Sequence, residues 1–133
     1  HGPHTTEAAA RLRGEGMIVW RTVRLADAVD LDRITPAVVA ADAVLIEPLV
    51  PHALGGTGAS LPLELARAAR TRLGKHRMVL AGGLTPERVA RAIALIQPDV
   101  VDVSSGVEFS PGVKDPARIT RFVEAVVGHH PTS

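Results

Sequence analysis

Cysteine is absent from this 133-residue chain, and aromatic residues are scarce. Without cysteine, the chain has neither disulfides nor a thiolate metal site. Its aromatic residues are Trp20, Phe109 and Phe122, too few for the stacking platforms that bind single-stranded nucleic acid. The formal net charge is +1 and the arginines are scattered, so no footprint for DNA or RNA is evident. The histidines lack metal-ligand spacing, and we expect neither a metal site nor a nucleic-acid partner.

Long apolar runs are also missing, because no stretch approaches the roughly 20 residues of a membrane span. No signal-peptide pattern follows His1. Hydrophobic residues make up 46% of the chain, which argues against a disordered protein. We therefore expect residues 1–133 to form one soluble, cytoplasmic domain that is a fragment of a longer chain, with residues 128–133 as a frayed tail.

Two kinds of segment alternate along the chain. Short β-branched runs predict strands at 17–23, 43–46, 77–80 and 100–103. Longer Ala/Leu/Arg-rich stretches with helical spacing predict helices at 5–13, 27–40, 61–73, 86–96 and 116–127. Thr85 and Asp115 each precede a proline, a pattern typical of a helix start. In the last helix, we expect one side to be apolar. It comprises Ile119, Phe122, Val123, Val126 and Val127.

The strand runs are apolar throughout, as in parallel strands that are covered on both faces. Repeated strand–loop–helix units are typical of α/β folds with right-handed crossovers. Four units fit part of a (β/α)8 barrel, and they also fit a doubly wound sheet. Composition and periodicity do not choose between these two architectures.

Ligands of parallel α/β folds bind at the carboxyl ends of the strands, so the loops after the strands are the candidate sites. Gly55, Gly56 and Gly58 lie in the loop after the second predicted strand, where they permit positive φ and close approach to a ligand. Gly82 and Gly83 directly follow the third strand and expose backbone N–H groups that suit a phosphate. Either loop also fits an ordinary turn.

The loop after the fourth strand carries hydroxyls and small residues. Asp102 lies near the end of a strand otherwise made of valines, where a buried carboxylate needs a partner or a site. Ser104, Ser105 and Gly106 follow it and supply hydroxyl and backbone donors, although they also fit a plain turn. Glu47 ends the second strand, and its carboxyl fits either a general acid or base, or a structural ion pair with an arginine.

Several segments together resemble phosphoribosylanthranilate isomerases. Residues 79–87 (VLAGGLTPE) resemble the family's seventh strand and loop, and residues 55–58 (GGTG) resemble the loop after its sixth strand. Residues 101–108 (VDVSSGVE) and 110–115 (SPGVKD) resemble its eighth strand and loop, and residues 1–2 (HG) resemble the end of its fourth strand. The resemblance implies a TIM-barrel fold of which this chain holds the last four β/α units, preceded by one helix.

The family's activity is an Amadori rearrangement in tryptophan biosynthesis, which uses no cofactor. An acid protonates the ribose ring oxygen of N-(5'-phosphoribosyl)anthranilate, and a base removes the proton from C2. The resemblance assigns the acid to Glu47 and a sugar contact to Asp102. The phosphate and substrate loops match the remaining candidates. These are Gly56, Gly58, Gly82, Gly83, Ser104, Ser105 and Gly106.

The chain departs from the family pattern at Glu47, where aspartate is usual, and at Leu49, where lysine is common. It also lacks the cysteine base of the first strand. Three hypotheses follow. The chain is an isomerase completed by an N-terminal half, it is a non-catalytic phosphate-binding half-barrel that needs a second copy or a complementary half, or it is a related isomerase with an altered substrate.

Overall fold

A computed structural model describes residues 5–50 and 59–129. Four parallel strands form one sheet in the order β1-β2-β3-β4. Their bounds are β1 Trp20–Leu25, β2 Ala43–Pro48, β3 Met78–Leu80 and β4 Val100–Val101. Strands that neighbour one another in chain order are the arrangement of a (β/α)8 barrel, whereas doubly wound sheets reverse their order. The structure therefore favours the barrel-type reading of the sequence.

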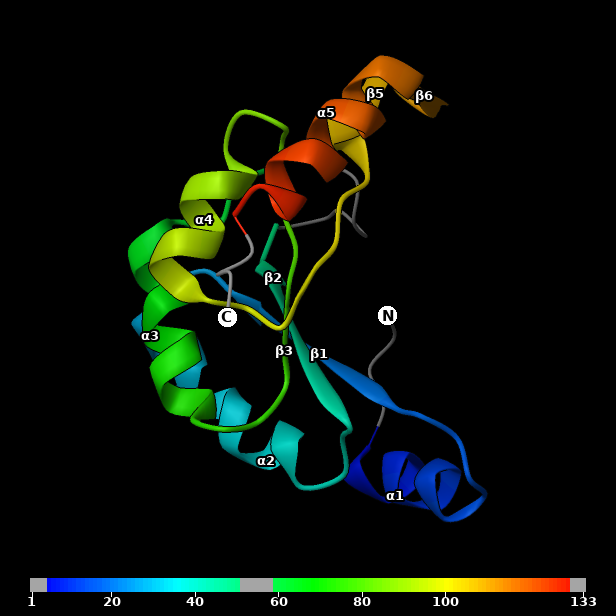
Figure 1. The fold of residues 1–133 in the computed structure, drawn as a ribbon. Helices are drawn as coiled ribbons and strands as arrows, with labels where there is room; N and C mark the ends of the chain where they lie inside the picture. Colours follow the sequence, from blue (N-terminus) through cyan, green and yellow to red (C-terminus); the bar gives the residue numbers. More distant parts are fainter. Residues whose placement is uncertain (1–4, 51–58, 130–133) are drawn as a thin grey trace.

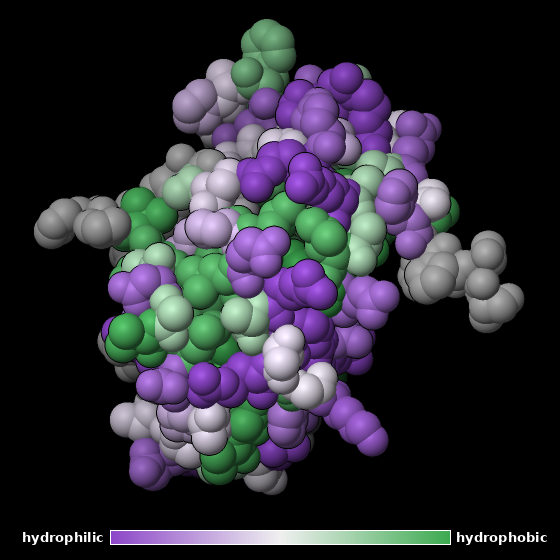
Figure 2. All heavy atoms as spheres, turned by 90° about the vertical axis from the view of Figure 1, so that its left-hand side faces the viewer, coloured by the Kyte–Doolittle hydropathy of each residue, from purple (hydrophilic) through white to green (hydrophobic). Residues whose placement is uncertain are grey.

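The helices α2, α3 and α4 separate the strands and lie along one side of the sheet, whereas α1 precedes β1 and lies apart from them (Figure 1). Within the described chain, no helix combines the length and the apolar character needed to cross a membrane. On the outer face over α3 and α4, hydrophilic residues run between hydrophobic patches (Figure 2). The helices are α1 Thr6–Gly14, α2 Ile34–Val38, α3 Leu63–Leu73, α4 Val89–Ile96 and α5 Pro116–Val127, with 3-10 turns η1 Ala28–Arg33 and η2 Ser105–Val107.

The helix predicted over residues 27–40 is wrong as a single element, because η1 and α2 share that stretch. Asp27 and Asp30 form a capping box that begins η1. The Asp30 carboxylate also accepts from the backbone N–H of Ala26 at 2.7 Å, which holds a tight turn. Pro36 falls in the first turn of α2, where its missing N–H needs no intrahelical acceptor.

The first strand begins later than the sequence pattern predicts, at Trp20 rather than at residue 17. Trp20 is the first residue to pair with β2, opposite Ala43. Before that point, Val19 is held by the Asp42 carboxylate, which accepts from its N–H at 2.7 Å. Met17 and Ile18 are exposed because no strand of the described sheet lies beside them.

The two faces of the sheet bury separate groups of apolar residues. Val44, Ile46, Met78 and Leu80 pack with the helices in the larger core. The opposite face carries a small buried cluster of Ala43, Leu45, Val79 and Ala81, with Val100 against it. Side chains alternate along a strand, so Glu47 shares this second face with Ala43 and Leu45.

The last part of the chain differs from its predicted pattern in two respects. An antiparallel hairpin of β5 Glu108–Ser110 and β6 Val113–Lys114 precedes α5. Asp115 caps α5 as predicted, accepting from the N–H of Ala117 at 2.9 Å. However, Phe122 alone of the predicted apolar side is buried, and Ile119, Val123 and Val127 are exposed. The helix packs mainly on α4 and η2, so one narrow stripe is covered.

Candidate active site

Glycine lets three loops meet at the carboxyl ends of β2, β3 and β4. A Cβ on Gly82 would lie 2.0 Å from Cδ of Pro48, at the end of β2. A Cβ on Gly83 would lie 2.6 Å from Cα of Ser60, before α3. Both glycines have positive φ, +95° and +70°, which side chains rarely adopt. Any larger residue at either position would force the loops after β2 and β3 apart.

The loop after β4 is joined to this pair in the same way. A Cβ on Gly106 would lie 1.7 Å from the carbonyl oxygen of Leu84. Gly106 therefore brings the start of η2 directly onto the loop that follows β3. The loop after β3 therefore lies against the loop after β4, and against Pro48 and Ser60 on either side of the undescribed residues 51–58.

A cavity of about 570 Å³ opens between these loops. Three of the predicted site residues line it, Gly83, Ser105 and Gly106. Gly82, Ser104, Asp102 and Glu47 lie outside its lining. The other lining residues are Ser60, Leu84, Thr85, Arg88, Glu108, Phe109, Asp115 and Arg118.

The backbone N–H groups of Gly82 and Gly83 are candidate donors to a ligand. Within the described residues, no backbone hydrogen bond uses the N–H of Gly82 or Gly83. Their lack of side chains leaves those donors uncovered, which is the usual property of backbone anion sites. Positively charged side chains surround the same loops and give them a favourable field for an anion.

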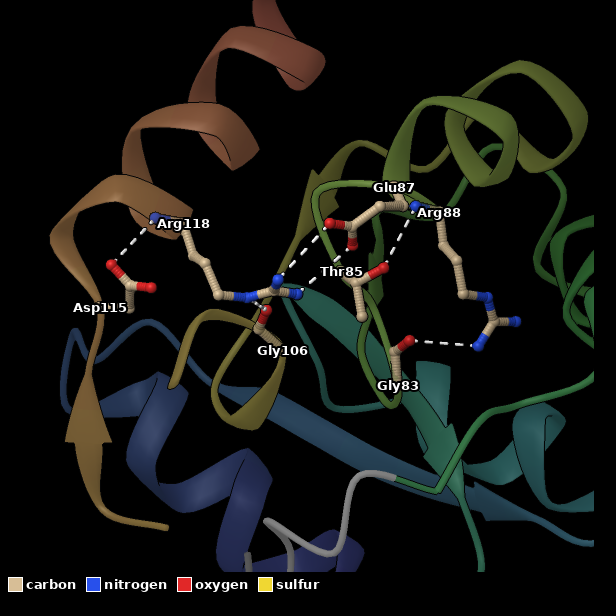
Figure 3. A network of polar contacts seen from close by, with 7 residues as sticks. All are labelled: Gly83, Thr85, Glu87, Arg88, Gly106, Asp115 and Arg118. Atoms are coloured by element: carbon tan, nitrogen blue, oxygen red, sulfur yellow. Dashed lines mark hydrogen bonds and ion pairs between the residues drawn. The ribbon is translucent and has the colours of Figure 1, made fainter. Parts of the chain in front are cut away.

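Two arginines bind the carbonyl oxygens of the cavity glycines (Figure 3). Nε of Arg118, from α5, donates to Gly106 O at 3.0 Å. Arg88 lies just before α4 and donates through Nη1 to Gly83 O at 3.2 Å. Arg118 also forms an ion pair with Glu87 at 3.3 Å. The pKa of the Glu87 carboxyl is lowered, mainly because its own backbone N–H donates a hydrogen bond to it. A hydrogen bond from the Thr85 side chain and the positive charge of Arg118 lower this pKa further.

Lys114 connects the hairpin to the loop after β4. Its Nζ donates to Ser104 O at 2.8 Å and pairs with Glu108 Oε1 at 2.9 Å. The Lys114 hydrogen bond, followed by that from the Gly112 N–H, lowers the pKa of Glu108. Ser104 itself is exposed. Its place is thus held by a lysine that motif reasoning missed, although Lys114 stood within the resembling segment.

Glu47 lies at the end of β2 beside a second residue that the sequence reasoning did not name. Nε of Arg24, its register partner on β1, lies 2.8 Å from Glu47 Oε1. Oε1 of Glu47 is buried, and it accepts no hydrogen bond from the described residues. The contact with Arg24 is therefore an ion pair whose atoms are poorly aligned for a hydrogen bond. Strand alternation places Arg24 on the same face of β1 as Thr22 and Trp20, but its pairing with Glu47 depends on the register of β1 with β2, which a local pattern does not show.

Asp102 is exposed, which corrects the expectation that its carboxylate needs a buried partner. Its N–H continues the pairing of β4 with β3 by donating to Leu80 O at 2.9 Å. Gly56 and Gly58 lie outside the described residues.

A family model for N-(5'-phosphoribosyl)anthranilate isomerase matches residues 1–125 of the chain. The chain belongs to the N-(5'-phosphoribosyl)anthranilate isomerase family. The isomerase of Geotalea uraniireducens is 39% identical over 128 residues, which cover 96% of this chain and 59% of that protein. The isomerase of Trichlorobacter lovleyi is 52% identical over 79 residues, which cover 59% of this chain and 38% of that protein.

Solved isomerases share the fold as well. A Thermotoga maritima phosphoribosyl anthranilate isomerase superposes with a TM-score of 0.80 at 34% identity, covering 96% of this chain and 60% of that one. An isomerase in complex with reduced 1-(o-carboxyphenylamino)-1-deoxyribulose 5-phosphate superposes with a TM-score of 0.76 at 30% identity, covering 96% and 57%. The chain spans less than two thirds of the length of each of these isomerases.

Proposed function

We propose that this chain carries the phosphate-binding site and the general acid of an N-(5'-phosphoribosyl)anthranilate isomerase. This isomerase acts in tryptophan biosynthesis in the cytoplasm. The observation that carries the proposal is the meeting of three glycine-dependent loops at the carboxyl ends of consecutive parallel strands. Phosphate sites of (β/α)8 barrels are commonly built from the loops after the last two strands. Accordingly, β1 to β4 represent the last four strands of such a barrel.

The proposed phosphate site uses the N–H groups of Gly82 and Gly83 together with Ser105 and Gly106. The cavity of about 570 Å³ is lined by three of these residues and is of ordinary size for a small-molecule site. We include the hydroxyl of Ser104, which neighbours Ser105 in the chain but lies outside the cavity lining. The solved complex with a deoxyribulose 5-phosphate compound supports a sugar phosphate as the ligand of this family.

The proposed acid is Glu47, with Asp102 as a sugar contact on the same face of the sheet. Protonation of the ribose ring oxygen opens the ring and leaves a Schiff base between C1 and the anthranilate nitrogen. Loss of the C2 proton to a base then gives the enol form of the aminoketose product. The family resemblance assigns that base to a cysteine, which this chain lacks. The proposal therefore covers the general acid and the phosphate-binding site.

Glu47→Gln tests the acid. The amide keeps the shape of the side chain but supplies no acidic proton, so turnover of N-(5'-phosphoribosyl)anthranilate should fall by roughly 100-fold or more. Binding of ribose 5-phosphate should persist, because Glu47 lies outside the cavity. Glu64→Gln, at an exposed position of α3, is the matched control. Unchanged turnover in Glu47→Gln would remove Glu47 from the mechanism.

A second candidate function is phosphate binding without turnover, in a half-barrel that needs a partner. The outer edges of β1 and β4 pair with no strand of the described residues, and Trp20 on β1 is 49% exposed. Open strand edges are templates for pairing with more chain. The partner is then the rest of a longer chain or a second copy of this one.

Sedimentation of the purified chain tests this candidate. An assembly larger than the 14.0 kDa chain, with affinity for ribose 5-phosphate but no turnover, would favour it over the isomerase. A folded monomer of that mass would count against the need for a partner.

An altered substrate is the third candidate, and it rests on Glu47 and Leu49. Compared with the family pattern, glutamate replaces the shorter aspartate at position 47, and leucine replaces lysine at position 49. Both changes alter the side chains at the end of β2. Preference for an aminoaldose phosphate without the anthranilate ring would support this candidate. Preference for the anthranilate compound would exclude it.

A further inference from the structure

Arg88 lies at the junction of two of the site loops. It is half-buried at the start of α4 and lines the cavity beside Gly83. Its Nη1 donates both to Gly83 O and to Oγ of Ser60, so the guanidinium bridges the loop before α3 and the loop after β3. None of the motifs that point to the phosphate site includes this residue as a ligand.

Arg88 differs from the other ionised groups around the cavity in how its charge is paired. Arg118 is paired with Glu87, and Glu108 is paired with Lys114. Asp115 accepts from the N–H groups at the start of α5. In the part of the chain that the structure describes, Arg88 forms no ion pair. It is therefore the cavity cation whose charge is left without a carboxylate.

The guanidinium also has hydrogen bonds to spare. Arginine has five N–H donors in a planar fork, and both protein contacts of Arg88 use Nη1. The donors on Nη2 and Nε form no hydrogen bond with the described residues. A planar pair of donors on a permanent cation suits two oxygens of a phosphate.

We propose that Arg88 is a specificity-determining residue that binds the phosphate monoester dianion of the substrate in this cavity. The inference rests on the proposed phosphate site and adds a charged side chain to its backbone donors. Gly83 O and Ser60 Oγ hold the guanidinium in place before the ligand arrives, which reduces the entropy lost on binding. Arg88 then selects phosphorylated over unphosphorylated sugars.

Calorimetric titration with ribose 5-phosphate tests the inference, with ribose as the phosphate-free control. We expect Arg88→Gln to weaken ribose 5-phosphate binding roughly tenfold or more, which is the usual worth of a hydrogen bond to a charged group. Arg88→Lys keeps the charge but loses the fork, so its loss should be smaller. Arg91→Gln removes an exposed arginine one turn further along α4 and should bind like the parent.

Ser60→Ala separates ligand binding from loop support. If Arg88 only tied Ser60 to Gly83, removal of either partner would weaken binding equally, and the inference would be wrong. We expect Ser60→Ala to lose clearly less affinity than Arg88→Gln, with both variants folded by circular dichroism.

The remaining outcomes distinguish this inference from the proposed function. Tight binding that is unchanged in Arg88→Gln would overturn the role of Arg88 and leave the phosphate site standing. No binding of ribose 5-phosphate by the parent protein would overturn both. Loss of binding in Arg88→Gln from a parent that binds but does not turn over would support Arg88 while the isomerase assignment fails.

Discussion

Arg24 and Glu47 face each other across β1 and β2, with Nε of the arginine 2.8 Å from Oε1 of the glutamate. Their side chains are 25% and 13% exposed, so water screens the pair only in part. The pair lies at the carboxyl ends of the two strands, on the face away from the helices. The arginine thereby fixes the position of the carboxylate that we propose as the acid.

Arg24→Met should destabilise the protein by about 1–3 kcal/mol, because it leaves a largely buried carboxylate without its cation. Urea unfolding measures this loss. The double variant Arg24→Met/Glu47→Met should recover at least about half of it, since replacing both charges by apolar groups removes the unpaired partner. A double variant as unstable as the sum of the two single ones would show that the pair has no coupling.

Gly106→Ala should damage both stability and the phosphate site. The added Cβ would lie 1.7 Å from Leu84 O, so the loops after β3 and β4 must separate. We expect a loss of about 1–3 kcal/mol in chemical unfolding, together with weaker binding of ribose 5-phosphate.

Gly14→Ala is the control for Gly106→Ala. Gly14 ends α1, and a Cβ there would meet nothing within 4 Å. Alanine should therefore leave stability unchanged or raise it by about 0.5 kcal/mol. Equal losses in the two variants would contradict the close approach of the loops.

Glu108 predicts a dependence of stability on pH. Its pKa lies below the usual 4.5, because Lys114 and the Gly112 N–H donate to the carboxylate. A carboxyl with a lowered pKa in the folded state stabilises the protein above pH 4.5, and this contribution is lost as the pH falls through the folded value.

Lys114→Met checks that dependence. The variant should have a lower Tm than the parent at pH 7, and the difference should shrink as the pH falls below 4.5. Lys75→Met removes an exposed lysine and should give a constant, small difference over the same range. A pH-independent difference for Lys114→Met would exclude the ion pair as a source of stability.

Phe122 attaches α5 to the rest of the molecule. It is 6% exposed, whereas Val123 beside it is 52% exposed. Phe122→Ala should cost about 3–5 kcal/mol in urea unfolding, and Val123→Ala should cost less than about 1 kcal/mol. Comparable losses would restore the broad apolar face that the sequence pattern predicts for this helix.

Local sequence patterns predicted the positions of those helices and strands whose ends depend on their own residues. The apolar runs of β2 and β3 predicted strands within two residues of their observed ends, and Asp115-Pro116 predicted the start of α5. The boundaries of β1 and η1 depend on a partner strand and on a carboxylate network around Asp30, and neither is visible in a local pattern.

The site shows the same limit. Glycine-rich loops at strand ends pointed to Gly83 and Gly106, because the residue type itself reports a backbone without space for a side chain. Arg24, Arg88 and Lys114 are long side chains, and their targets depend on how separate strands and loops pack. The hairpin after β4 does have a local signal, because Pro111-Gly112 between its two strands is a typical turn sequence.

The glycine contacts also couple segments that are far apart in the sequence. Gly82 packs against Pro48, Gly83 against Ser60 and Gly106 against Leu84, so each loop lies in direct contact with its neighbour. The effect of a substitution in one loop should therefore depend on the residue that the neighbouring loop carries, so paired substitutions here should not be additive.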